Sequence, residues 1–395
     1  MSDLAIRACT PDDWPAVSEL GARTFSDGSE VGYQRSLIGW RRLPQSPDFD
    51  WTDVYIGVVD GQVVAHVRVV DAVLRLGQVA LRFGGLSGVV THPDYRGRGY
   101  AAALVRACIR AMEDAGQVLS LLDGIPRFYG QFGYASVWPN YTLSFTAGEA
   151  ANVPDDGSGY VVRPGSEADL PALLALYNAQ WQARPWFVER SLDALRFRLP
   201  PPLAGDQPYF VVVEDAAGSL RGYSTGYRAD DRSEVLATDP AAVSALMRHA
   251  AAAYAEDPAH EIKWLVAPDE PAAYYAGRFC KVGYHRWYSP NGGWMARMID
   301  AQATIDRVRP LLVAWWEALG APGELDVTHC IEGVRLRLAS NTLTVPQGRF
   351  LQLLFGFLTP REIDETLTDR DIELRDHLKR LFPPVTNQLA GLDWF

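Results

Sequence analysis

Cysteine and histidine are scarce in this 395-residue chain, and neither occurs in a metal-binding pattern. The four cysteines are Cys9, Cys108, Cys280 and Cys330. They form no C-x-x-C pair, which argues against a structural zinc site and against a disulfide framework. The seven histidines are equally scattered, and none stands at i, i+4 spacing with a partner that could complete a metal site. We therefore predict no metal.

Long apolar runs and an export signal are also missing. No run approaches the roughly 18 apolar residues that a membrane span requires, although 48% of the chain is hydrophobic. The N-terminal residues do not combine a basic segment with a following apolar stretch, as a secretory signal would. We expect no membrane partner and a cytoplasmic location.

An excess of positive charge is lacking as well. The 37 Lys and Arg residues face 48 Asp and Glu residues, which gives a net charge of -11 at pH 7. Such a charge repels polyanions and attracts cations by long-range steering. We expect no nucleic-acid partner, and an amine substrate is mildly favoured.

The length of the chain predicts more than one domain, because ordinary domains hold roughly 100 to 200 residues. We expect three, at residues 1–147, 158–298 and 299–395. A polar stretch rich in turn-forming residues, 148–159, has the composition of a linker. The last part of the sequence predicts an α+β domain. We expect a helix over 301–319, strands near 325–331, 333–339 and 341–346, and helices after Pro346 and Pro360.

The first part alternates strands and helices, which is typical of an α/β fold. A strand over 4–8 leads into a helix that starts near Thr10-Pro11. Two β-rich runs flank Asp60-Gly61, a strong hairpin signal. Further strands are expected at 78–83 and 118–122, with an alanine-rich helix over 99–115 between them. A strand over 140–145 is expected to complete this domain.

The second part repeats the opening plan, which suggests an internal duplication. Residues 160–163 read as a strand, and a helix follows to about residue 183. The aromatic stretch 274–284 echoes residues 128–134. Residues 235–243 pass from strand to helix without a glycine that would let phosphates approach. We predict that this second copy is degenerate and has lost its cofactor.

One motif in the first part carries chemistry. After a strand that ends at Thr91 and a break at Pro93, Arg96-Gly97-Arg98-Gly99-Tyr100-Ala101 opens the helix of 99–115. A glycine-rich turn between strand and helix directs backbone N–H groups and the positive helix end toward one point, where a pyrophosphate binds. The motif alone is weak evidence for phosphate binding. Its place between a strand and a helix, however, favours a phosphate site over an ordinary turn.

These residues resemble the GNAT acetyltransferases, whose pattern of Arg/Gln-x-x-Gly-x-Gly/Ala after a strand is met by residues 96–101. The order of parts is similar to the Eis (enhanced intracellular survival) type: one intact GNAT unit, one degenerate unit and a sterol-carrier-like α+β domain. The resemblance implies acetyl-CoA as co-substrate and direct transfer of its acetyl group to a primary amine of a polycationic small molecule, such as an aminoglycoside or polyamine. It also implies a homo-oligomer.

The resemblance implies site residues too. The pyrophosphate is expected on Arg96, Gly97, Arg98, Gly99, Tyr100 and Ala101. Backbone groups of Val89, Val90 and Thr91 are expected to pair with the pantetheine amides. Tyr129 matches the tyrosine that acts as general acid, and the Phe395 carboxylate matches the C-terminal general base. Asp27 and Glu30 are candidates for an acidic amine pocket, with Asp393 near the end of the chain.

Each of these residues could instead have a purely structural role or none. Tyr129 stands among aromatic residues and could simply pack in the core. Phe395 could end a frayed tail, although residues 389–395 are apolar for a free tail. Asp27 and Glu30 could be ordinary solvated acids.

Two other functions stay open. In the first, the protein is a binding module whose last domain holds an apolar ligand or partner and whose first domain binds acyl-CoA without turnover. In the second, it acetylates lysine in proteins or peptides. Turnover with polyamines, and competition between polyamines and lysine peptides, distinguish these alternatives.

Overall fold

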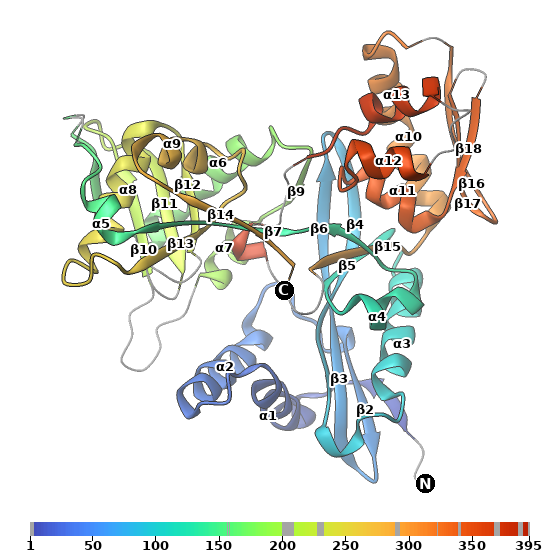
Figure 1. The fold of residues 1–395 in the computed structure, drawn as a ribbon. Coiled ribbons are helices and arrows are strands. Elements are labelled where there is room, and N and C mark those ends of the chain that lie inside the picture. The colour runs from blue at the N-terminus through green and yellow to red at the C-terminus, as the bar shows by residue number, and fades with distance from the viewer. Residues whose placement is uncertain are drawn as a thin grey trace. The chain divides into compact units, whose positions relative to one another are not determined.

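The computed structural model of the chain divides into two compact units, each assembled from separate stretches of sequence (Figure 1). Over the described residues, unit 1 comprises 4–137 and 294–384, and unit 2 comprises 138–293 and 385–393. The structure describes residues 4–155, 157, 159–199, 209–226, 233–288, 293–321, 323–338, 341–366, 372–385 and 390–393. The C-terminal part of the chain thus contributes to both units.

Unit 1 contains a mixed sheet with strand order β1-β2-β3-β4-β5-β15-β6. Its strands are β1 (Ala5–Ala8), β2 (Val54–Val59), β3 (Gln62–Leu76), β4 (Val79–Thr91), β5 (Leu119–Asp123), β6 (Ala135–Trp138) and β15 (Trp294–Met298). Strands β1 to β4 are antiparallel neighbours, and β5 runs parallel to β4. The expected hairpin is confirmed, because Asp60 and Gly61 both have positive φ, 49° and 79°, as a type I′ turn requires.

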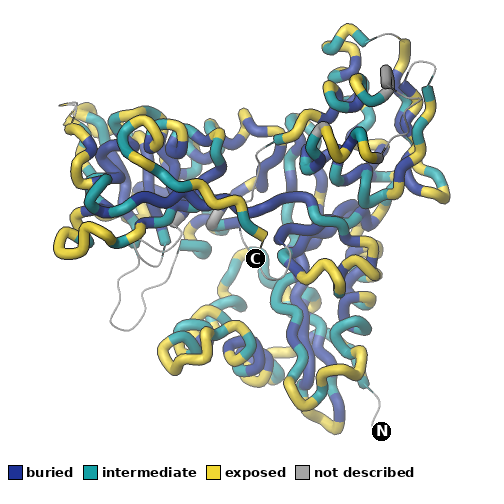
Figure 2. The backbone as a smooth tube through the Cα atoms, viewed as in Figure 1, coloured by how far each residue is buried: buried dark blue, intermediate teal, exposed yellow. Residues whose placement is uncertain are grey.

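The helices in the N-terminal part of unit 1 are α1 (Trp14–Phe25), α2 (Glu30–Arg42), α3 (Tyr100–Asp114) and α4 (Pro126–Tyr129). Helix α2 starts where the Ser29 hydroxyl accepts the N–H of Gly32 at 2.9 Å, a side-chain N-cap. Helix α3 packs on the sheet through residues at helical spacing, namely Leu104, Val105, Cys108, Ile109 and Met112. The middle parts of β3 and β4 are buried, whereas α2 is mostly exposed or half-buried (Figure 2).

Two strands pair in a different sheet from the one that their position in the sequence suggests. Strand β7 (Asn140–Thr146) pairs with β13 and β14 in unit 2, so the expectation that residues 140–145 complete the first domain is wrong. In the other direction, β15 lies within the range expected for the second domain but pairs with β5 in unit 1. The sequence favours a β conformation for both segments, but strand propensity does not specify the partner.

Unit 2 contains a second mixed sheet with strand order β14-β7-β13-β12-β11-β10-β8. Besides β7, its strands are β8 (Val161–Pro164), β10 (Tyr209–Glu214), β11 (Leu220–Gly226), β12 (Ser233–Ala237), β13 (Glu261–Leu265) and β14 (Gly283–Trp287). The short strand β9 (Trp186–Val188) is not part of this sheet. The helices are α5 (Ala147–Ala151), α6 (Leu170–Trp181), α7 (Leu192–Arg198), α8 (Pro240–Ala252) and α9 (Pro271–Phe279). Antiparallel β10, β11 and β12 followed by parallel β13 repeat the order of β2 to β5.

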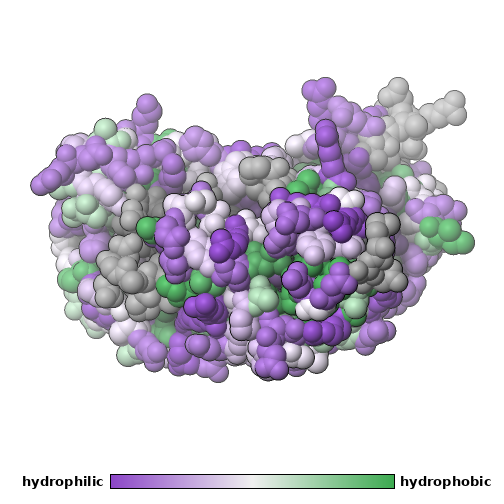
Figure 3. Space-filling view, turned by 90° about the horizontal axis from the view of Figure 1, so that it is seen from below, coloured by the Kyte–Doolittle hydropathy of each residue, from purple (hydrophilic) through white to green (hydrophobic). Residues whose placement is uncertain are grey.

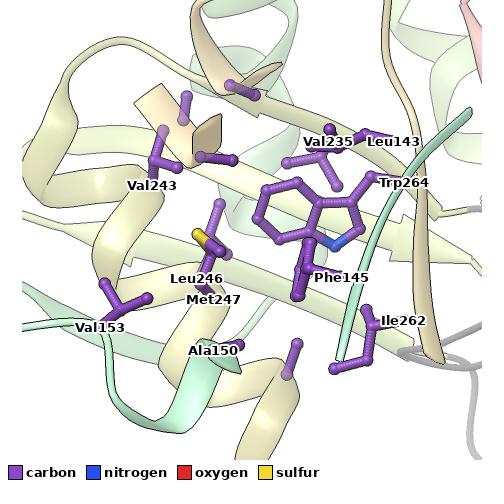
Figure 4. Packing of buried hydrophobic residues seen from close by; sticks show 14 of the residues in the cluster. Leu143, Phe145, Ala150, Val153, Val235, Val243, Leu246, Met247, Ile262 and Trp264 are labelled. Atoms are coloured by element: carbon purple, nitrogen blue, oxygen red, sulfur yellow. The ribbon is translucent and has the colours of Figure 1, made fainter. Parts of the chain in front are cut away.

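Trp264 lies at the centre of the core on one face of this sheet (Figure 4). Its indole makes an edge-to-face contact with Phe145 at 4.9 Å between ring centroids. Helix α8 contributes Val243, Leu246 and Met247 to the same cluster. Because Phe145 belongs to β7, this strand is part of the core of unit 2.

The C-terminal part of unit 1 is an α+β assembly, as expected. Its elements are α10 (Ala301–Ala318), β16 (Leu325–Cys330), β17 (Gly333–Leu338), β18 (Asn341–Val345), α11 (Gln347–Leu354), α12 (Pro360–Thr366) and α13 (Ile372–Leu381). It is tied to the sheet of unit 1 by Thr304 Oγ1, which donates to the carbonyl of Val118 at 2.9 Å. Its likeness to sterol carriers stays a prediction, as do the boundaries 1–147, 158–298 and 299–395.

Hydrophilic side chains cover most of the face shown in Figure 3, with hydrophobic residues in small groups between them. Over the described part of the chain, none of the helices has the length and apolar character that crossing a bilayer demands.

Candidate active site

The loop between β4 and α3 has the geometry of an anion site. Gly97 and Gly99 have φ of 75° and 81°, in the left-handed region that favours glycine. No atom lies within 4 Å of a Cβ built at either position, so the backbone conformation and not crowding selects glycine there. Helix α3 begins at Tyr100 directly after Gly99, which has no side chain to cap it. The first N–H groups of α3, including those of Tyr100 and Ala101, therefore remain available to a ligand.

Two arginines of this loop add positive charge. The side chains of Arg96 and Arg98 are exposed. Arg96 Nε donates to the carbonyl of Thr91 at 3.2 Å, and Arg98 Nη2 donates to the carbonyl of Asp94 at 3.2 Å. The Arg98 guanidinium lies over the ring of Tyr95 at 4.9 Å. These contacts hold the two charges beside the open end of α3, as a pyrophosphate would require.

Strand β4 parts from β5 before it reaches this loop. The two strands pair only from Phe83–Gly85 opposite Leu119–Leu121, while β4 continues to Thr91. Val89, Val90 and Thr91, the residues expected to contact pantetheine, lie in this stretch, where β4 pairs with β3 on one side and is not paired with β5 on the other. The Thr91 hydroxyl is buried and has no hydrogen-bond partner among the described residues. A buried unpaired hydroxyl is costly, so an external polar group at this position fits the site.

A β-bulge and an aromatic group mark the same stretch of β4. His66 pairs with Val90 and Arg68 with Ser87, so Gly88 and Val89 stand opposite a single residue of β3. Gly88 has φ of 60°, and a Cβ there would lie 2.4 Å from Trp40 of α2. Trp40 in turn stacks on Phe25 at 6.1 Å and contacts His66 at 5.1 Å between ring centroids. Sequence reasoning missed Trp40, because nothing in its local pattern shows which strand it covers.

Tyr129 ends α4 and is buried, with 7% of its surface exposed. Its ring lies edge-to-face with Phe128 at 4.9 Å and with Tyr134 at 6.0 Å. A Cβ on Gly124 would lie 2.4 Å from the Tyr129 ring, so the glycine makes room for it. Burial raises the pKa of Tyr129, and the charge of Asp123 adds to this shift. The phenol is therefore neutral and able to donate a proton at physiological pH.

The candidate acids lie in different surroundings. Asp27 and Glu30 are exposed at the turn from α1 to α2. Asp27 Oδ1 accepts the N–H and the hydroxyl of Ser29, and these hydrogen bonds lower the pKa of Asp27. Both residues stay candidates for amine binding. Asp393 is different, because it is buried and its carboxylate accepts hydrogen bonds from Arg190 and Arg198.

Phe395 lies outside the described residues, so its proposed role as the base stays a prediction. Among the residues that the structure describes, no cluster of three or more His, Cys, Asp or Glu side chains could hold a metal ion. Burial lowers the pKa of His66 to about 3, so this imidazole is neutral.

Comparison with known proteins supports the interpretation of this region. The family described as the acetyltransferase (GNAT) domain matches residues 5–137. The N-acetyltransferase Eis of Mycobacterium tuberculosis is 30% identical over 168 residues, which cover 40% of this chain and 40% of that protein. An aminoglycoside 2'-N-acetyltransferase of Mycolicibacterium fortuitum is 29% identical over 136 residues, covering 33% of this chain and 68% of that protein. The match to the Eis proteins thus spans well under half of their length.

Solved structures resemble the chain over its full length. A GCN5-related N-acetyltransferase from Kribbella flavida superposes with a TM-score of 0.69 at 18% identity, covering 100% of this chain and 99% of that one. Eis1 from Mycobacterium abscessus superposes with a TM-score of 0.62 at 15% identity, covering 100% of both chains. At these identities the likeness concerns the fold. Residues 5–137 thus match the acetyltransferase (GNAT) domain family, in a chain similar in sequence over part of its length to the Eis N-acetyltransferases.

Proposed function

We propose that this chain transfers the acetyl group of acetyl-CoA directly to a primary amine of a polycationic small molecule, such as an aminoglycoside or a polyamine. The observation that carries the proposal is the β4–α3 junction: a strand that parts from its neighbour, followed by two glycines with positive φ and an uncapped helix start. The Arg96–Ala101 loop would hold the pyrophosphate, and the backbone of Val89, Val90 and Thr91 would bind pantetheine.

The proposed chemistry needs one acid and one base. The neutral amine nitrogen attacks the thioester carbonyl, a C–N bond forms and the C–S bond breaks. Tyr129, whose pKa is raised by burial, gives its proton to the leaving sulfur. The Phe395 carboxylate takes the proton that the amine loses, directly or through water. Tyr129 then regains a proton from solvent, and the Phe395 carboxyl releases one to solvent, so that both groups return to their starting states.

The acceptor class is open to a direct test. Acetyl-CoA is supplied to the native chain with an aminoglycoside, a polyamine and a lysine peptide in competition, and acetylated products are quantified by mass spectrometry. We expect the small polycations to be acetylated first, in keeping with the net charge of -11. Preferential acetylation of the peptide would replace this proposal with a protein or peptide acetyltransferase. Binding of acetyl-CoA with no acetylated product would favour the binding module.

A further inference from the structure

An aromatic ring of α2 stands against the bulge of β4. Trp40 lies one turn after the buried Leu37 and is itself half-buried. A Cβ on Gly88 of β4 would overlap the end of its six-membered ring at Cη2. A Cβ on Gly21 of α1 would overlap the ring fusion at Cδ2 and Cε2. Two glycines, one on a helix and one on a strand, therefore make the room that this single indole occupies.

Other aromatic rings hold the indole in this position. Trp40 stacks on Phe25 at 6.1 Å between ring centroids, with 21° between the planes. Its ring makes an edge contact with His66 of β3 at 5.1 Å and lies 6.4 Å from Trp14 of α1. A side chain that packs on a helix and on two strands has few rotamers open to it. The indole therefore forms a fixed apolar wall at the bulge.

The stretch of β4 next to this wall is accessible. Residues 83–86 are buried, whereas Ser87, Gly88 and Val89 are half-buried. The change follows the end of the pairing between β4 and β5, whose last pair is Gly85 with Leu121. A bound molecule can thus reach the backbone of β4 at the residue where the indole lies.

The proposed function places the reacting end of acetyl-CoA at the same point. Its pyrophosphate lies on residues 96–101, and its pantetheine arm runs along Val89, Val90 and Thr91. Following β4 away from the loop, the next residue is Gly88, about 3.3 Å further along the strand. The thioester comes at the end of the pantetheine arm and therefore reaches Gly88. An acyl chain that extends beyond the thioester then meets the ring of Trp40.

We propose that Trp40 determines the length of the acyl group that this chain accepts, because its indole occupies the space at Gly88 that a chain longer than acetyl would need. This inference rests on the proposed function, which supplies the position of the thioester. It adds no chemical step to the transfer. The donors that it distinguishes are the short-chain acyl-CoA thioesters acetyl-, propionyl- and butyryl-CoA.

The test compares these three donors with one amine acceptor at one concentration. Trp40→Leu keeps an apolar side chain but empties most of the space of the indole, and Trp40→Phe empties less of it. Trp51→Leu is the matched control, because Trp51 is also half-buried in the same aromatic cluster but has its ring contacts with Trp14 and Phe49. Since the amine is the same throughout, any effect of Trp40 on the amine cancels in the ratio of kcat/KM for two donors.

We expect Trp40→Leu to raise the ratio of kcat/KM for butyryl-CoA over acetyl-CoA about tenfold or more, because two methylenes placed in an apolar space are together worth about that much. Trp40→Phe should raise the ratio less, with propionyl-CoA gaining before butyryl-CoA. Trp51→Leu should keep the native ratio. An unchanged ratio in Trp40→Leu, or an equal rise in Trp51→Leu, would overturn the inference while leaving acetyl transfer itself in place.

Calorimetric binding of acetyl-CoA and butyryl-CoA separates this inference from the proposed function. If native protein releases no thiol with any donor, the proposed function is wrong, and the affinities test the inference by themselves. Trp40→Leu should then raise the affinity for butyryl-CoA relative to acetyl-CoA about tenfold, and Trp51→Leu should leave it unchanged. Unchanged relative affinity in Trp40→Leu, or no binding of either thioester, would overturn the inference.

Discussion

At the scale of single residues, two neighbouring buried tyrosines, Tyr129 and Tyr134, have different expected roles: the first in catalysis and the second in packing. Burial raises the pKa of both Tyr129 and Tyr134, so both phenols stay protonated at neutral pH. The hydroxyl of Tyr134 donates to Ser120 Oγ at 2.7 Å, and that serine donates to the carbonyl of Gly84 at 2.7 Å. Tyr134 is thus committed to a structural chain of hydrogen bonds, which favours Tyr129 as the proton donor.

Replacing each tyrosine with phenylalanine distinguishes the two roles. We expect Tyr129→Phe to lower kcat about 100-fold, since general acid catalysis contributes that much or more, while the thermal midpoint changes little. Tyr134→Phe should instead cost about 1 kcal/mol of stability, because it leaves Ser120 without its donor, and should keep kcat near native. Steady-state kinetics and thermal unfolding of both variants check this pair. A similar loss of kcat in both would contradict the assignment.

Because of Glu270 in unit 2, we expect the free energy of unfolding of this protein to depend on pH. It is fully buried, and burial raises its pKa to about 7 even though it accepts the N–H of Ala267 at 2.7 Å. Its folded pKa lies above the unfolded value, so its stabilising contribution is complete below about pH 4.5 and is lost as the pH rises through 7. Glu270→Gln should therefore be more stable than native at pH 8 and similar to native at pH 5, with a gain on the order of 2 kcal/mol.

Urea unfolding at the two pH values measures this effect. Glu256, which is exposed, provides the control. Glu256→Gln should show no difference between pH 5 and pH 8. An equal effect of Glu270→Gln at both pH values would show that its carboxyl does not titrate in the folded state.

At the scale of elements, local signals predicted local structure. The Asp60-Gly61 hairpin, the helix after Gly99 and the α+β order of the C-terminal part are all present in the fold. These features depend on turn chemistry and periodicity, which short stretches of sequence carry. The exchange of β7 and β15 between sheets was not predictable, because both strands look alike in sequence whichever sheet they join.

The glycine loop offers a prediction at the same scale. Gly99→Ala places a side chain at φ of 81°, which costs about 1–2 kcal/mol and distorts the start of α3, so we expect weaker acetyl-CoA binding. Gly116→Ala is the control, since Gly116 lies after α3 with φ of 70° and equally open surroundings. It should lose comparable stability but bind acetyl-CoA normally by calorimetry. Weakened binding in both variants would point to general destabilisation.

At the scale of the whole molecule, the strand order of β2 to β5 in unit 1 recurs in β10 to β13 of unit 2. Unit 1 contains the glycine loop, whereas unit 2 buries Arg190 in ion pairs with Glu234 and Asp393. That cluster joins residues 203 positions apart in sequence, so no local pattern could reveal it. The repeated strand order agrees with the expected duplication, which stays a prediction. A homo-oligomer stays a prediction, which light scattering checks.

We propose above all that this chain moves an acetyl group from acetyl-CoA to an amine. The most direct test follows free thiol and acetylated amine together, with native protein, acetyl-CoA and an excess of an aminoglycoside. The account predicts continuous turnover in which each thiol released is matched by one new amide and no acetate accumulates. Tight binding of acetyl-CoA without thiol release, or thiol release matched only by acetate, would contradict it.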